Sequence, residues 1–378
     1  MSGFAAVQAN DPRDLIHRPD DLLSPSLVIF AERVDRNLDS MLAIAKGAER
    51  LRPHMKTHKM PAMIRRLESL GIRKHKCATI AEAEMAARAG ATDVLLAYPV
   101  VGPNLDRLAR LVETYPETTF RATVDHARSA QLLSEAMAES GRNLATLVDL
   151  DVGMGRTGID PNGAVGLASL VDRLANLTFD GLQGYDGQIR DLDPIERRRS
   201  VEPGLAIVVE VRDQLLKAGL PVNRLVLGGT PTFPIHAEVD LPGVECSPGT
   251  IVFHDAGYAS KFPDLPFEPA AFLLTRVVSC PRPGRVCLDL GHKAVAADPV
   301  GARLTLVDHP DATLVGQSEE HLVVEGPSIE PLVPGDLLWA IPTHICPTCA
   351  LHSWAYVVER GVVVDRWVVG ARDRVIGV

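Results

Sequence analysis

The sequence predicts an α/β fold: a (β/α)8 barrel of the TIM type, joined to a C-terminal all-β domain. From about residue 50 to residue 255, short β-branched runs alternate with segments whose apolar residues recur every three and four positions. After about residue 256 the runs are short, rich in strand formers and separated by Pro and Gly. Strict alternation over this length favours a barrel, although an open doubly wound sheet has the same periodicity.

Eight barrel strands are expected, at residues 50–55, 75–80, 94–99, 120–125, 144–151, 177–185, 224–227 and 244–253. Helices between them are expected at residues 81–89, 105–114, 127–139, 163–176 and 205–218. The C-terminal strands are expected at residues 272–279, 285–290, 302–307, 321–324, 337–341 and 356–358.

One further strand, at residues 26–30, precedes the first helix at residues 31–46 and has no place in the barrel. We expect it to join the β domain, because an isolated strand must pair with a sheet. The predicted domains are therefore the barrel, residues 31–255, and a β-rich domain made of residues 1–30 with 256–378.

Composition excludes several classes of protein. The chain has 378 residues, of which 46% are hydrophobic and 23% charged, so it can bury a sizeable core. The net charge of -9, without dense basic runs, argues against nucleic-acid and membrane-surface partners. No apolar stretch approaches the roughly 18 residues of a membrane span, and the N-terminus lacks the pattern of a signal peptide. We therefore expect a cytoplasmic protein with free or metal-bound thiols.

A lysine follows the first predicted strand, in the octapeptide Arg-Pro-His-Met-Lys-Thr-His-Lys at residues 52–59. Alternation on a strand places Arg52, His54 and Lys56 on one face, with Lys56 at the carboxyl end, where barrel enzymes assemble their chemistry. Burial makes such an amine a nucleophile toward aldehydes. Taken alone, the pattern also fits a solvated lysine at a strand end.

The octapeptide resembles the cofactor-lysine motif of the D-threonine aldolase and D-serine dehydratase family, which has an alanine racemase-like barrel of fold type III. The resemblance implies that pyridoxal phosphate is bound by Lys56, with Lys59 as the competing lysine. It extends to four further segments of the chain.

Two of these segments follow predicted strands. Residues 151–158 resemble a family loop whose arginine, here Arg156, binds the cofactor phenolate, a role that suits a fixed cation. Residues 184–188 resemble a segment whose tyrosine, here Tyr185, faces the cofactor or the substrate. Gln188 stands where relatives often carry histidine.

The other two barrel segments are implied to hold the phosphate. Gly229 and Thr230 offer a backbone N–H and a hydroxyl donor. Ser247, with Gly249 and Thr250, resembles the Arg-Pro-Gly segment of alanine racemase. Because Ser247 replaces the arginine that faces the pyridine nitrogen, this segment argues against a racemase.

His344 and Cys346 are spaced i, i+2, which on a strand places both on one face, and together they suit Zn²⁺. A structural four-ligand zinc site with Cys349 and His352, or a Cys346–Cys349 redox pair, is also compatible with the spacing. The family resemblance implies a His-x-Cys zinc pair, as in the dehydratases, whereas the aldolases use His-x-Asp. Zn²⁺ is favoured, with Mn²⁺ or Mg²⁺ as alternatives.

The resemblance implies a lyase that depends on pyridoxal phosphate and a divalent metal and acts on small D-3-hydroxy-α-amino acids. We favour β-elimination, in which Lys56 removes the α-proton and the products are a 2-oxo acid and ammonia. This is the reaction of D-serine and D-3-hydroxyaspartate dehydratases. Retro-aldol cleavage to glycine and an aldehyde is the alternative; it needs a base for the β-hydroxyl, for which His54 is available.

Two other functions are considered. A non-catalytic protein that handles pyridoxal phosphate is disfavoured by the long C-terminal part, and a racemase by Ser247. By analogy with the family, we expect a head-to-tail homodimer.

Overall fold

The computed structural model describes residues 16–378 and divides into two compact units. The β unit contains the described residues up to Ser40 together with Thr250–Arg372, and the barrel unit contains Met41–Gly249 with Asp373–Val378. The units divide at residues 40/41 and 249/250, whereas the predicted boundaries are at 30/31 and 255/256. Residues 1–15 of the predicted β-rich domain lie outside the described residues.

The last six residues correct the predicted domain limits, because they pack on the barrel unit. The Glu84 carboxylate accepts the backbone N–H groups of Gly377 and Val378, and Arg107 donates to the Val378 carbonyl. The sequence of this tail has no pattern that reveals where it docks.

The barrel unit is built on a parallel sheet, which in the described chain has seven strands in the order of the sequence. They are β2 (Lys74–Cys77), β3 (Asp93–Leu96), β4 (Thr119–Val124), β5 (Leu144–Leu150), β6 (Leu177–Gly184), β7 (Arg224–Leu227) and β8 (Val244–Cys246). Each agrees with a predicted strand to within a few residues, except that β8 ends at Cys246 rather than at 253.

The predicted first strand, residues 50–55, is not a continuous strand. Instead, Leu51 bridges Cys246 of β8, and His54 bridges Lys76 of β2, both in parallel. Pro53 has no N–H to donate, which limits regular pairing at this point. The two bridges still connect the first and last strands, so the sheet closes into the expected barrel.

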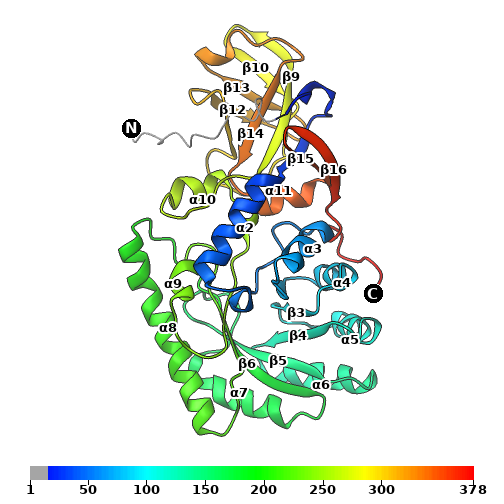
Figure 1. The fold of residues 1–378 in the computed structure, drawn as a ribbon, viewed down its shortest axis with the longest axis vertical. Helices are drawn as coiled ribbons and strands as arrows, with labels where there is room; N and C mark the ends of the chain where they lie inside the picture. Colours follow the sequence, from blue (N-terminus) through cyan, green and yellow to red (C-terminus); the bar gives the residue numbers. More distant parts are fainter. Residues whose placement is uncertain (1–15) are drawn as a thin grey trace. The chain divides into compact units, whose positions relative to one another are not determined.

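Helices follow the strands: α3 (Pro61–Ser69), α4 (Ile80–Arg88), α5 (Asn104–Thr114), α6 (Ala127–Glu139), α7 (Pro161–Arg173), α8 (Pro194–Lys217) and α9 (Phe233–Ala237) (Figure 1). The helices α4 to α8 correspond to predicted ones, whereas α3 and α9 were not predicted. Their starts are set by caps. Thr79 accepts the Glu82 N–H at the start of α4, and Asp193 accepts two N–H groups at the start of α8. Helix α8 begins 11 residues before the predicted start at 205, because it continues through Pro203.

The β unit contains a mixed sheet with nine strands in the described part of the chain. β1 (Ser26–Phe30) pairs with β15 in parallel and with β9 antiparallel, so it joins this sheet as expected, and it leads into α2 (Ala31–Ala45). The other strands are β9 (Ala271–Arg282), β10 (Arg285–Leu288), β11 (Leu304–Leu306), β12 (Thr313–Gln317), β13 (Leu322–Glu325), β14 (Leu337–Pro342), β15 (Trp354–Glu359) and β16 (Val362–Val368).

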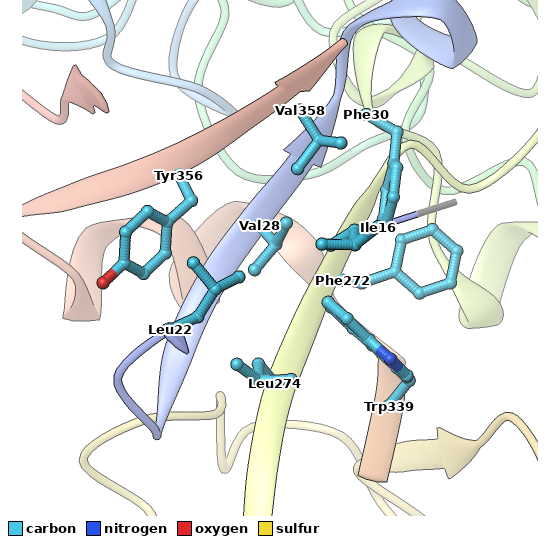
Figure 2. Close-up of a cluster of buried hydrophobic side chains, with 9 residues drawn as sticks. All are labelled: Ile16, Leu22, Val28, Phe30, Phe272, Leu274, Trp339, Tyr356 and Val358. Carbon is cyan, nitrogen blue, oxygen red and sulfur yellow. The ribbon is translucent and has the colours of Figure 1, made fainter. Parts of the chain in front are cut away.

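The core of the β unit lies on one face of this sheet. Phe30, Phe272 and Trp339 come from three different strands, and the ring centres of Phe30 and Phe272 are 5.2 Å apart, edge to face (Figure 2). The same cluster contains Ile16, Leu22, Val28, Leu274, Tyr356 and Val358. Val28 and Phe30 belong to β1, which explains why the strand joins this unit.

The prediction of an all-β C-terminal part is wrong in two places. Short helices α10 (Ala256–Lys261) and α11 (Ile345–Leu351) interrupt the strands. Both are too short for a helical period to be recognised in the sequence. None of the helices within residues 16–378 combines the length and apolarity needed to cross a membrane.

Candidate active site

A pocket at the carboxyl ends of the barrel strands collects side chains from distant parts of the sequence. Its lining includes His54 and Lys56 from the bridging segment, Asp149 from β5, and Arg156 and Tyr185 from the loops after β5 and β6. Carboxyl ends of parallel strands meet at one end of a barrel, so residues far apart in the chain become neighbours there.

Tyr185 lies between two basic side chains, Lys56 and Arg156, in the pocket. The Lys56 Nζ lies 5.7 Å from the centre of the Tyr185 ring, and the Arg156 guanidinium carbon lies 5.0 Å from it. Lys56 is half-buried, whereas Arg156 is exposed. Two cations thus face one aromatic ring at the barrel mouth.

His54 is held as a neutral imidazole. Burial, followed by the nearby charges of Lys56 and Lys76, holds the pKa of His54 well below its usual range. Its Nδ1 accepts the backbone N–H of Lys56 at 3.3 Å, which also fixes the start of the lysine turn. With Nδ1 as an acceptor, the remaining N–H of the neutral ring lies on Nε2 and can donate a hydrogen bond into the pocket.

Lys59, the competing lysine, points away from this pocket. Its ammonium forms an ion pair with Glu82, a fully buried carboxylate of α4 that also accepts the Ala78 N–H. Lys59 does not line the pocket. The structure therefore favours Lys56 as the reactive amine.

Two ionisable residues of the pocket were not identified from the sequence: Lys76 of β2 and Asp149 of β5. Lys76 is 3% exposed, and burial, followed by the charge of Lys56, lowers its pKa to about 7. Burial raises the pKa of Asp149, although hydrogen bonds from Gln183 and Thr157 oppose the shift. A lysine and an aspartate inside predicted barrel strands were a usable signal, because buried strands of a parallel barrel are normally apolar.

The loop after β7 has the close packing expected of a phosphate site. Gly228 has a φ of +72°, and a Cβ there would meet the His236 ring at 2.4 Å. Thr232 accepts the Gly229 N–H and donates to Asp186 at 2.8 Å, and His236 lies 2.7 Å from the same carboxylate. Glycine is therefore required at Gly228. The contacts of Thr232 and His236 with Asp186 hold the loop in place.

The remaining predicted phosphate residues fall on both sides of the division between the units. In the barrel unit, the Gly249 N–H donates to the Thr230 hydroxyl at 3.3 Å, and the Ser247 hydroxyl donates to the Arg52 carbonyl at 2.9 Å. In the β unit, the Thr250 hydroxyl lies 3.6 Å from the Cys346 sulfur.

The barrel pocket fits pyridoxal phosphate. Buried and half-buried amines suit its aldehyde, Arg156 suits its phenolate, and the glycine loop suits its phosphate. An anionic aldehyde would also offset the cations that crowd the pocket.

His344 and Cys346 lie together, but not on a strand. His344 is the N-cap residue of α11, and Cys346 lies in the first turn of the helix. The strand assumption is therefore wrong, and the two side chains meet because a helix start turns them to one side. Their contact is strong enough to raise the pKa of His344 to about 9, against the opposing effect of burial.

A carboxylate completes the surroundings of His344. The Nδ1 of His344 lies 2.6 Å from Asp298, which leaves Nε2 for another partner. Metal-binding histidines commonly present their second nitrogen to a carboxylate in this way. The pair offers an imidazole and a thiol as two ligands for a divalent cation, and Asp298 orients the imidazole without adding a third ligand.

The alternative four-ligand zinc site is not supported. Cys349 is fully buried, and His352 Nε2 bonds to the Ala294 carbonyl at 2.8 Å. Within residues 16–378, no group of three or more His, Cys, Asp or Glu side chains is arranged to hold a metal ion. No disulfide joins Cys346 to Cys349 in this structure, and the redox pair stays a prediction.

Comparison with known proteins places the chain in a family. Residues 29–256 match the family described as alanine racemase, N-terminal domain, and residues 270–358 match the putative serine dehydratase domain. The chain is 33% identical to D-threonine aldolase from Arthrobacter sp, over 98% of both chains. It belongs to the D-threonine aldolase and D-serine dehydratase family.

Other members of this family differ in their named reaction. The chain is 28% identical to D-threo-3-hydroxyaspartate dehydratase from Delftia sp., over 61% of each chain. The crystal structure of D-threonine aldolase from Filomicrobium marinum superimposes with a TM-score of 0.86 at 31% identity, over 93% of this chain and 96% of that one. The family contains both aldolases and dehydratases, which are all lyases.

Proposed function

We propose that this protein is a lyase of D-3-hydroxy-α-amino acids that depends on pyridoxal phosphate and a divalent metal, and that it carries out β-elimination. The observation that carries the proposal is the barrel mouth, where Lys56 and Arg156 face Tyr185, whose ring also packs against Gly229 of the loop after β7. The expected products are a 2-oxo acid and ammonia.

The residues of the barrel have distinct roles. When bound, pyridoxal phosphate withdraws electrons from the substrate Cα, and a divalent cation polarises the β-hydroxyl. Lys56 holds the cofactor and then takes the α-proton on its Nζ, with His54 as a neutral acceptor nearby. Arg156 would hold the phenolate, and Tyr185 would lie beside the cofactor. Thr230 would hold the phosphate together with the Gly229 N–H, once that N–H leaves the Thr232 hydroxyl.

In the β unit, His344 and Cys346 would bind the metal, with Zn²⁺ favoured because a thiolate and an imidazole form the pair. Asp298 orients His344 through its 2.6 Å contact with Nδ1. The resemblance implies an aspartate in place of this cysteine in the aldolases, so the thiolate also favours elimination.

Retro-aldol cleavage is the second candidate. It is favoured by the full-length similarity to D-threonine aldolase, which is higher than the similarity to the dehydratase. In this reaction a base must take the proton of the β-hydroxyl, and His54 is the neutral base that the pocket offers.

One experiment separates these reactions. Purified protein with cofactor and Zn²⁺ is incubated with D-serine, D-threonine and D-3-hydroxyaspartate in turn. Elimination releases ammonia and a 2-oxo acid, whereas retro-aldol cleavage releases glycine and an aldehyde. Glycine without ammonia would overturn elimination, and the absence of any product would favour a cofactor-handling role.

The metal is tested in the same assay. Chelation, or His344→Ala, is expected to lower turnover at least about 100-fold while leaving the cofactor attached. Full activity after complete chelation would contradict a catalytic metal. A homodimer, proposed from the family, is checked by light scattering of the purified protein.

A further inference from the structure

The barrel mouth contains a second lysine for which the proposed chemistry has no role. Lys76 is the third residue of β2 and lines the same pocket as Lys56. Its Nζ lies 5.9 Å from the centre of the Tyr185 ring, against 5.7 Å for Lys56. Both amines are therefore near the same part of the pocket.

Lys59 and Lys74 each form an ion pair with a glutamate, whereas Lys76 forms none within residues 16–378. Lys74 Nζ lies 2.8 Å from Glu245, and Lys59 is paired with Glu82. Lys76 Nζ has no ion-pair or hydrogen-bond partner among residues 16–378, although only 3% of the residue is exposed. A buried ammonium without a counter-ion is costly, so this position favours the uncharged amine.

The charges around Lys76 support the same conclusion. They come from every side of the pocket: Arg52, Lys56, Asp149 and Asp186. Burial and then Lys56 lower the pKa of Lys76 to about 7, while the two aspartates oppose this shift. A large share of the amine is therefore uncharged and nucleophilic near neutral pH.

We propose that Lys76 is a second aldehyde-reactive amine of the barrel pocket, able to attach the same cofactor that Lys56 holds. The inference rests on the proposed function, because pyridoxal phosphate is the aldehyde. The Lys76 nitrogen attacks the aldehyde carbon, a C=N bond forms, and the aldehyde oxygen leaves as water with the two amine protons. The pocket thus has two attachment points for one cofactor.

The test uses the full-length Lys56→Met variant, which keeps the length of the side chain but removes the amine. The variant is incubated with pyridoxal phosphate, reduced with borohydride, digested and analysed by mass spectrometry. The label is expected on Lys76, at a level at least about tenfold above that in the Lys56→Met/Lys76→Met double variant. Labelling should rise as the pH is raised through about 7.

The native chain, labelled in parallel, separates the two hypotheses. If native protein is labelled on Lys56 but the Lys56→Met variant is unlabelled, or is labelled on Lys59, the second amine is refuted and the proposed function stands. If native protein takes no label, the proposed function fails and the inference fails with it. Circular dichroism confirms folding, and Lys56→Arg replaces the first variant if Lys56→Met does not fold.

Discussion

The two ends of the barrel differ in whether their charged side chains form ion pairs. Toward the amino-terminal ends of the strands, charges of opposite sign alternate in a closed ring, in which each cation contacts two acids. The ring runs through Asp93, Arg121, Asp180, Arg224, Glu245 and Arg52. Burial alone would raise the pKa of Glu245, yet Arg52 and Lys74 hold it at about 2.

At the carboxyl ends the charges are not matched. Lys56, Lys76 and Arg156 gather around one tyrosine ring, and the nearby Asp149 is bonded to Gln183 and Thr157 instead. The paired buried charges maintain the folded state, because removal of one partner would leave the other charge buried and unpaired. The basic side chains at the opposite end have no ion-pair partner among residues 16–378 at the pocket, so an anionic ligand would be favoured there.

The largest expected effect tests the unmatched end. Lys56→Ala should lower turnover at least about 10³-fold, because the α-proton loses its acceptor. Its thermal unfolding without cofactor should match that of the native protein, since Lys56 forms no ion pair with any residue from 16 to 378. Lys217→Ala on the exposed face of α8 is the control, and retained turnover would move the base to another residue.

The next effect tests the matched end. Glu245→Gln should lower the free energy of unfolding by about 3–5 kcal/mol, because Arg52 loses a buried counter-ion. Since the pKa of Glu245 falls from 4.5 to about 2 on folding, the loss should be complete above pH 4.5. It should shrink as the pH falls toward 2.

Urea unfolding of Glu245→Gln beside Glu113→Gln, an exposed control on α5, measures this difference. If both variants unfold alike, the ring contributes nothing to stability and the contrast between the two ends fails.

A smaller effect is expected for Arg156→Met. Loss of a charged hydrogen bond to the phenolate should weaken cofactor binding about 10- to 100-fold, without a change in stability. Absorbance titration of dialysed protein with pyridoxal phosphate measures the affinity, with the exposed Arg173→Met as control. Unchanged affinity would remove Arg156 from the cofactor site.

The last prediction concerns the stability of protein free of cofactor and the burial of Lys76. Because the pKa of Lys76 drops from 10.5 to about 7 on folding, its burial destabilises the fold fully below pH 7 and not at all above 10.5. Lys76→Met should therefore stabilise the protein near pH 7, and the gain should shrink as the pH rises. A gain that is independent of pH would mean that Lys76 titrates normally.

Much of this molecule was predictable from local pattern. Seven barrel strands and most helices were located from periodicity, since a parallel barrel requires apolar strands at regular intervals. Lys56 was predicted as the cofactor lysine because the eight residues 52–59 form a recognisable motif around it. Where the pattern was broken by Pro53 or Pro203, the predicted element was wrong in extent.

The sequence by itself determined the fold class and the family, because these depend on periodicity and on residues close together in the chain. Only the tertiary structure decided that Lys59 is neutralised by Glu82 while Lys76 is not, and that His344 and Cys346 meet at a helix start. The physical reason is that the charge of a side chain depends on its burial and on partners that are distant in sequence, and neither is visible before the strands are brought together.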